Sequence, residues 1–94
     1  MINMKIFKEF MLDATVLSPQ TLYIPANSEV VDVYSSDRGV CVLALSDPNE
    51  ENFQLRTFKI CAKDENIYTD TVKYIGSFEG RAGKRFLLEI IRGD

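Results

Sequence analysis

Histidine is absent from this 94-residue sequence, and cysteine occurs only at Cys41 and Cys61. Histidine is the side chain that most often transfers protons near neutral pH, and it is a usual zinc ligand. Two thiols are too few for an all-cysteine zinc site, so we expect no metal and no cofactor. Each cysteine lies within an apolar run, which is typical of small core residues in a reducing compartment.

Groups that would activate a nucleophile are also scarce. Ser35, Ser36 and Ser77 have neither a histidine nor an obviously buried lysine to remove a proton. The acidic residues at positions 47, 50 and 51 lie in one polar loop, where solvent is a more common environment than a catalytic cleft. The sequence therefore predicts a protein that is not an enzyme.

Long hydrophobic runs are missing as well. No apolar run approaches the roughly 18 residues of a membrane-spanning helix, and Lys5 interrupts the first apolar residues before a signal-peptide core can form. We therefore expect a cytoplasmic protein. The net charge of −3 and the pI of about 4.9 argue against duplex nucleic acid and anionic membranes as partners.

The hydrophobic pattern predicts one all-β domain over residues 1–94. Six to seven short runs separated by turns favour an antiparallel meander that forms a small closed or half-closed barrel. Residues 40–45 (VCVLAL) are apolar on both faces, as in a central strand, and residues 5–12 (KIFKEFML) fit a helix or, preferably, a strand. The apolar residues change phase within residues 53–62, which predicts a bulge near Arg56 and Thr57, and residues 65–68 have room for one helical turn.

The most regular stretch, residues 72–91 (VKYIGSFEGRAGKRFLLEII), has the pattern of a hairpin. A three-residue loop of Arg81, Ala82 and Gly83 would put Gly83 where a left-handed residue is needed and Gly80 opposite Lys84. This register predicts three cross-strand pairs: Phe78 with Phe86, Tyr74 with Ile90, and Glu79 with Arg85.

Two stretches, residues 24–51 (IPANSEVVDVYSSDRGVCVLALSDPNEE) and residues 74–91 (YIGSFEGRAGKRFLLEII), carry a family resemblance. They resemble a family of short, uncharacterised bacteriophage and prophage proteins. In that family a proline turn precedes a valine-rich strand, a buried strand ends in Asp-Pro, and Tyr-Ile-Gly opens the last hairpin. The chain departs from the family at residues 61–64, where members have a glycine-rich segment, and at Leu88 or Glu89, where members have a histidine. The resemblance implies a phage source and brings no known activity.

The hairpin tip is the first candidate site. Backbone N–H groups beside Gly83 can form an anion nest, to which Arg81, Lys84 and Arg85 would add charge-assisted bonds to a phosphate. The alternative is an ordinary hairpin whose basic residues are solvated.

Tyrosines are the second set of candidates, because aromatic faces stack on nucleobases. The alternative for each tyrosine is a position at the edge of the core with its hydroxyl in solvent. Tyr68 stands out because it lies in a polar connection, and Tyr23 is the next residue to consider.

These observations predict a phage-encoded binding protein of the host bacterial cytoplasm that counters host defence. The sharper form is a small homo-oligomer that sequesters a phosphate-bearing nucleotide immune signal, with exposed strand edges pairing identical subunits. The alternative is a protein-binding inhibitor of a host factor, or a virion accessory protein, that docks its acidic loops on a basic surface.

Overall fold

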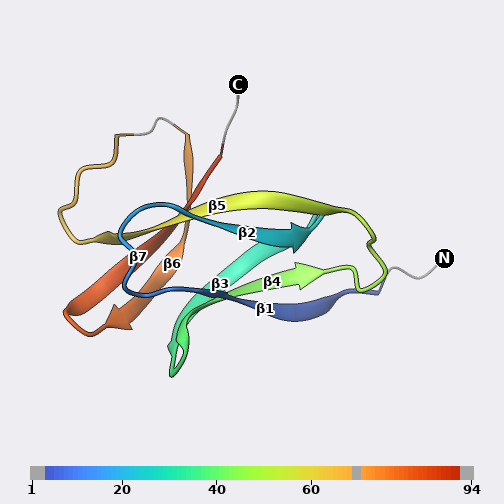
Figure 1. Ribbon diagram of the computed structural model, residues 1–94, viewed down its shortest axis with the longest axis horizontal. Helices are drawn as coiled ribbons and strands as arrows, with labels where there is room; N and C mark the ends of the chain where they lie inside the picture. Colours follow the sequence, from blue (N-terminus) through green and yellow to red (C-terminus); the bar gives the residue numbers. More distant parts are fainter. Residues whose placement is uncertain (1–3, 69–70, 92–94) are drawn as a thin grey trace.

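Seven antiparallel strands are divided between two sheets (Figure 1). The computed structural model describes residues 4–68 and 71–91. The first sheet has three strands, in the order β1 (Ile6–Leu12), β4 (Gly39–Ser46) and β3 (Glu29–Ser36). The second has four, in the order β2 (Gln20–Pro25), β5 (Phe53–Ala62), β7 (Gly83–Ile90) and β6 (Val72–Gly80). The described residues contain no helix, so the all-β prediction is confirmed and residues 65–68 do not form a helical turn.

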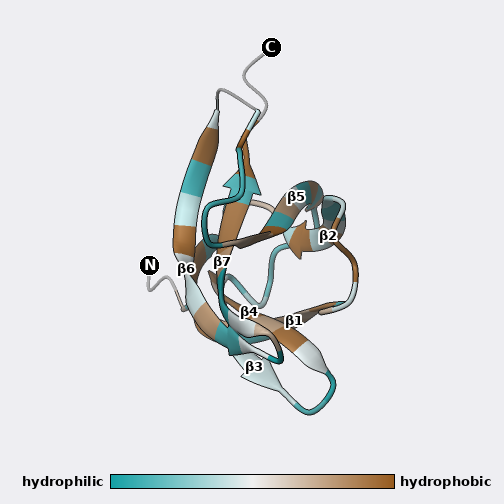
Figure 2. Cartoon of the chain, turned by 90° about the vertical axis from the view of Figure 1, so that its left-hand side faces the viewer, coloured by the Kyte–Doolittle hydropathy of each residue, from teal (hydrophilic) through white to brown (hydrophobic). Residues whose placement is uncertain are grey.

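The strand order differs from the predicted meander. Only β3–β4 and β6–β7 pair as neighbours along the chain, whereas β1 pairs with β4 and β2 pairs with β5. The chain therefore passes between the sheets several times and forms two layers. The described strands do not form a closed barrel, although the edges β3 and β6 approach each other (Figure 2). There the Ser35 hydroxyl donates a hydrogen bond of 2.5 Å to the carbonyl oxygen of Glu79.

The β6–β7 hairpin forms as predicted, but its register is shifted by one residue. Gly80 pairs with Gly83, so the loop contains only Arg81 and Ala82. Gly83 has a φ of 118°, which confirms that a glycine is needed there. It belongs to β7 and not to the loop, so the loop is one residue shorter than predicted. A one-residue shift places residues predicted to be partners on opposite faces.

The predicted cross-strand pairs are consequently wrong. Phe86 faces Ser77, and Glu79 faces Lys84. A second irregularity, between Tyr74 and Gly76, moves the far end of the hairpin by another residue.

The core lies between the two sheets and is built from alternate residues of each strand. In β4 the inward residues Val40, Val42 and Ala44 are buried, as expected for a central strand. The opposite sheet contributes other core residues, including Phe58 and Leu87. In Figure 2 the hydrophobic positions along β6 are separated by hydrophilic ones, and the register shift between Tyr74 and Gly76 interrupts the two-residue alternation.

Two sequence predictions about individual strands have different outcomes. The preferred strand reading of residues 5–12 is confirmed by β1. The bulge near Arg56 and Thr57 is wrong, because β5 pairs continuously with β2 and then with β7. Irregularities occur instead in β3, between Val30 and Asp32, and in β6. The phase change in β5 therefore needs another explanation.

Candidate functional site

The basic residues of the hairpin tip do not converge on one face. Lys84 and Arg85 are consecutive in β7, so their side chains leave opposite sides of the sheet. Arg81 and Lys84 are exposed, whereas Arg85 is half-buried and donates a hydrogen bond of 3.3 Å to the carbonyl oxygen of Lys84. Glu79 and Arg85 form no ion pair in the described part of the chain. The tip presents separate cations rather than a cradle for one phosphate.

The two tyrosine candidates lie away from the tip. Tyr68 is 90% exposed and lines a pocket of about 510 Å³ beside Ile90, at the opposite end of β7 from Gly83. Tyr23 lies on β2, where its ring meets that of Phe53 edge-on at 6.1 Å between centroids. The structure therefore distributes the candidate residues over the tip, the pocket and β2.

The pocket at Tyr68 has the volume of a small ligand site, but its cation is already engaged. Lys59 Nζ donates hydrogen bonds to Glu65 Oε2 at 2.6 Å and to the carbonyl oxygen of Leu17 at 3.1 Å. The bond from Lys59, together with the backbone N–H of Ala62, lowers the pKa of Glu65 from its ordinary value of 4.5. The site is thus internally neutral and better suited to an apolar or aromatic group than to a phosphate.

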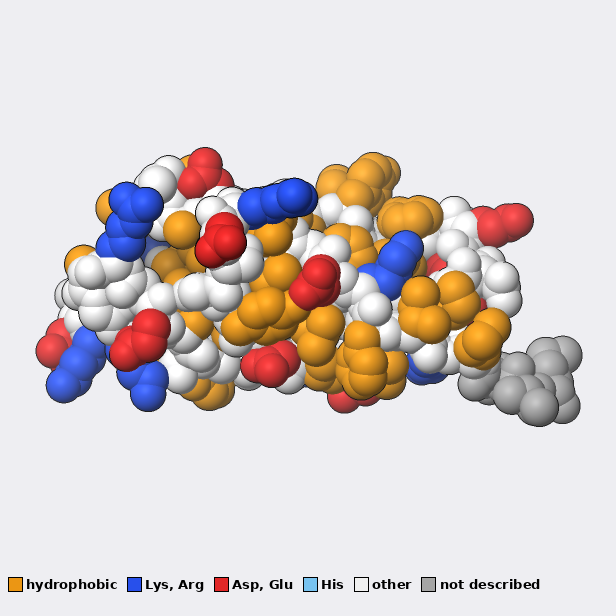
Figure 3. Space-filling model, turned by 90° about the horizontal axis from the view of Figure 1, so that it is seen from below, with side chains coloured by type: hydrophobic (Ala, Val, Ile, Leu, Met, Phe, Trp, Pro, Cys, Tyr) orange, Lys and Arg blue, Asp and Glu red, His pale blue; other side chains and the backbone are white. Residues whose placement is uncertain are grey.

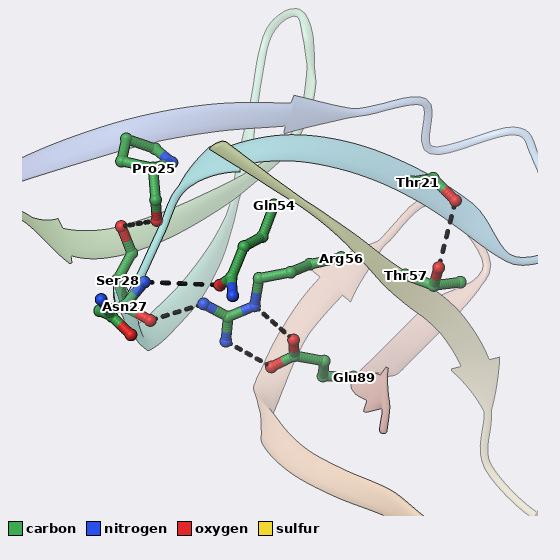
Figure 4. Close-up of polar contacts among 8 residues, drawn as sticks. All are labelled: Thr21, Pro25, Asn27, Ser28, Gln54, Arg56, Thr57 and Glu89. Atoms are coloured by element: carbon green, nitrogen blue, oxygen red, sulfur yellow. Dashed lines mark hydrogen bonds and ion pairs between the residues drawn. The ribbon is translucent and has the colours of Figure 1, made fainter. Parts of the chain in front are cut away.

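A buried ion pair joins β5 to β7 inside the molecule, and the sequence reasoning missed it (Figure 4). Arg56 binds Glu89 with two hydrogen bonds, of 2.6 Å from Nε and 2.9 Å from Nη2. Its third nitrogen, Nη1, donates to the carbonyl oxygen of Ser28, in the turn between β2 and β3. The Arg56 side chain is 17% exposed and that of Glu89 is 4% exposed.

This ion pair explains the phase change in β5. Inward positions near Arg56 hold polar side chains, so the apolar residues Phe53 and Leu55 point outward. The ion pair thus holds β5 against β7 from the inner side, while the outer side of β5 carries apolar residues. The change of phase within residues 53–62 was therefore the available sequence signal for an exposed hydrophobic surface.

The outer face of the four-stranded sheet is uncharged at its β2–β5 end. Tyr23 lies opposite Leu55, and the two side chains are 64% and 68% exposed. Phe53 continues this surface on one side, and on the other the hydroxyls of Thr21 and Thr57 are hydrogen-bonded at 3.2 Å. We call these five residues the neutral face.

The outer face of the three-stranded sheet combines apolar and acidic side chains. Three rows cross it, as the strand register shows: Phe7–Leu45–Glu29, Glu9–Leu43–Asp32 and Met11–Cys41–Tyr34. We call these nine residues the acidic face. Figure 3 views the molecule from the side on which this sheet lies, and hydrophobic side chains gather there with acidic side chains among them.

The carboxylates of the acidic face have no cationic partner within residues 4–68 and 71–91, where the only ion pairs are Arg56–Glu89 and Lys59–Glu65. Cys41 is buried on this face, and its pKa is raised by burial and by the adjacent Glu9 carboxylate. Glu9 lies on the edge strand β1, one row along the face from Cys41.

Both cysteines are buried, as predicted, but neither belongs to the main core cluster. Cys61 lies in β5 on the side that carries Lys59. Its pKa is raised mainly by burial. The two thiols therefore lie on different sheets and form no disulfide.

Comparisons with protein-family models, curated proteins and solved structures find no match to this chain. The resemblance to phage proteins therefore stays a prediction. No helix formed by the described residues is long and apolar enough to cross a membrane.

Proposed function

We propose that this protein is a non-catalytic protein-binding module that contacts its partner through the acidic face. The partner presents lysine or arginine residues around an apolar centre. The observation that carries the proposal is the middle row of the face, in which Leu43 lies between Glu9 and Asp32. Adjacent strands are about 4.8 Å apart, so the strands bearing these carboxylates are separated by roughly 10 Å, with an apolar surface between them.

The apolar part of the face supplies binding energy. Phe7 is 64% exposed, and an aromatic side chain that becomes buried removes on the order of 150–250 Å² from water. At about 25 cal/mol per Å², covering the exposed part of Phe7 contributes roughly 2–4 kcal/mol before association costs. Met11, two rows away on β1, adds a flexible side chain, which suits a surface that adapts to a partner.

The carboxylates supply orientation and selectivity. Each exposed ion pair contributes about 0.2–1 kcal/mol, so Glu9, Glu29 and Asp32 together favour a basic partner by roughly 1–3 kcal/mol. The same charges repel acidic surfaces. The acidic loop at residues 47–51 follows β4 directly, and its Asp47 and Glu50 carboxylates accept hydrogen bonds from nearby backbone N–H groups, as Asp32 does from Val33.

In the setting implied by the phage resemblance, this module inhibits a host protein. Sequestration of a phosphate-bearing nucleotide at the hairpin tip remains a prediction, and the separation of Lys84 from Arg85 gives it less support. The exposed Arg81 is the residue on which that alternative chiefly depends.

The test measures binding of a fluorescent amphipathic peptide made of leucine and lysine, with a leucine–glutamate peptide as the reference. The face variant carries Glu9→Gln, Glu29→Gln and Asp32→Asn. The matched control, which changes the net charge equally, carries Asp47→Asn, Glu50→Gln and Glu51→Gln.

We expect the wild type to bind the leucine–lysine peptide but not the leucine–glutamate peptide. The face variant should bind the leucine–lysine peptide about 10- to 100-fold more weakly. The loop variant should retain most of the affinity. Equal losses in the two variants would show that net charge, not the acidic face, determines binding.

A further inference from the structure

We propose that a second copy of this chain covers the neutral face, with a two-fold axis that lies above the sheet and parallel to the Thr21–Thr57 row. In this arrangement Leu55 of each copy lies over the pocket beside Tyr68 of the other. The pocket is then completed by the second subunit. The inference concerns the opposite sheet and does not depend on the proposed partner of the acidic face.

The distribution of charge favours self-association through this face. Tyr23, Phe53, Leu55, Thr21 and Thr57 are all uncharged, so two copies can approach without like-charge repulsion. Packing two acidic faces together would instead bring their carboxylates into opposition. Like charges placed opposite each other are unfavourable, which leaves the neutral face as the one suited to an identical subunit.

The position of the axis follows from spacing along β5. Leu55 and Lys59 lie two residues on either side of Thr57, which is about 7 Å in each direction. A two-fold axis that passes above Thr57, parallel to the sheet and perpendicular to the strand, places Leu55 over Lys59 of the second copy. Lys59 lines the pocket together with Ile67 and Tyr68.

The chemistry of the pocket matches the side chain that would enter it. Its cation is neutralised by Glu65, and its lining includes Pro19, Ile67 and Ile90. An aliphatic group such as Leu55 fits this environment. Tyr68, which is 90% exposed in the single chain, would cover the inserted side chain from the loop side.

The exposed apolar area is sufficient for a modest dimer. Tyr23, Phe53 and Leu55 together expose on the order of 350 Å², judged from aromatic side chains of about 150–250 Å² each. Counting both subunits and the pocket residues, the interface reaches roughly 1,000 Å², the lower range for specific complexes. We therefore expect a dissociation constant in the micromolar range.

The test is sedimentation velocity of the full chain over a concentration series. Leu55→Asp should weaken dimerisation at least tenfold, because it places a carboxylate in the interface. Tyr23→Ser, directly opposite Leu55 on β2, is a second variant of the same surface and should weaken dimerisation as well. Phe7→Asp is the matched control, since Phe7 is 64% exposed on the acidic face and Leu55 is 68% exposed on the neutral face.

Tyr68→Ala tests the position of the axis, because it also should weaken dimerisation if the pocket receives Leu55. A wild type that stays monomeric at several hundred micromolar would overturn the proposal. So would a Phe7→Asp variant that loses the dimer while Leu55→Asp keeps it. An unchanged dimer in Tyr68→Ala would overturn the assigned axis.

Discussion

Replacing Arg56 by alanine tests the buried ion pair that supports the outer faces. The substitution removes both hydrogen bonds to Glu89, whose side chain is only 4% exposed, and the bond to the Ser28 carbonyl. Breaking a buried pair by removing one partner costs about 3–5 kcal/mol, because the remaining charge is buried without compensation. A domain of this size has a total stability of roughly 5–14 kcal/mol. We therefore expect Arg56→Ala to be marginally folded.

Urea unfolding followed by circular dichroism measures the effect. Lys59→Ala is the control, since Lys59 and Glu65 form a pair whose side chains are 23% and 33% exposed. That pair should contribute only about 0–1 kcal/mol. The double variant Arg56→Met with Glu89→Leu should recover most of the lost stability, because no charge stays buried. A loss below about 1 kcal/mol in Arg56→Ala would refute the view that this pair is desolvated and structurally essential.

Three further predictions concern pH, thiols and glycines. Because the pKa of Glu65 is lowered in the folded protein, its pairing with Lys59 stabilises the fold above the unfolded pKa. That contribution is lost as the pH falls through the pKa of Glu65 in the folded protein. In the Glu65→Gln variant, the urea midpoint should therefore lose this part of its decrease at acidic pH. The raised pKa values and burial of Cys41 and Cys61 predict slow reaction with a thiol reagent in the native protein and fast reaction in denaturant; fast native labelling would contradict this. Gly39→Ala should destabilise more than Gly83→Ala in thermal melts, because a Cβ at position 39 would lie 2.5 Å from the Leu12 carbonyl oxygen, whereas position 83 has open space. Equal losses in the two glycine variants would show that the close contact at position 39 is relieved.

Local patterns predicted most strands. The central strand β4 follows from the continuous apolar run of residues 40–45, whereas residues 5–12 fitted a helix as well as a strand, and β1 confirms the preferred interpretation. The hairpin register failed because Gly83 was assigned to the loop, whereas its positive φ is accommodated within β7. The change is a single residue, yet it separates Phe78 from Phe86.

Nonlocal pairing was beyond the sequence patterns. The choice between a barrel and two layers depends on which distant strands pair, and alternation within a strand does not contain that information. Arg56 and Glu89 are 33 positions apart, so nothing in their spacing indicated an ion pair. The phase change in β5 was visible, but a bulge and a polar interior produce the same pattern.

The predicted site residues were chosen by chemical type, and the fold separates them. Arg81 and Lys84 form an exposed basic tip, while Tyr23 and Tyr68 lie with the neutral face and its pocket. The acidic face could not be recognised from charge clusters in the sequence. Its carboxylates come from β1 and β3, and they meet only because both strands pair with β4.

The most direct test of the proposed function maps the binding surface by NMR. The ¹⁵N-labelled protein is titrated with the leucine–lysine peptide, and amide shifts are followed residue by residue. We expect the largest changes at Glu9, Leu43 and Asp32, with smaller changes along β1, β4 and β3. Changes concentrated at the hairpin tip or on the neutral face, or no changes at all, would contradict the proposed function.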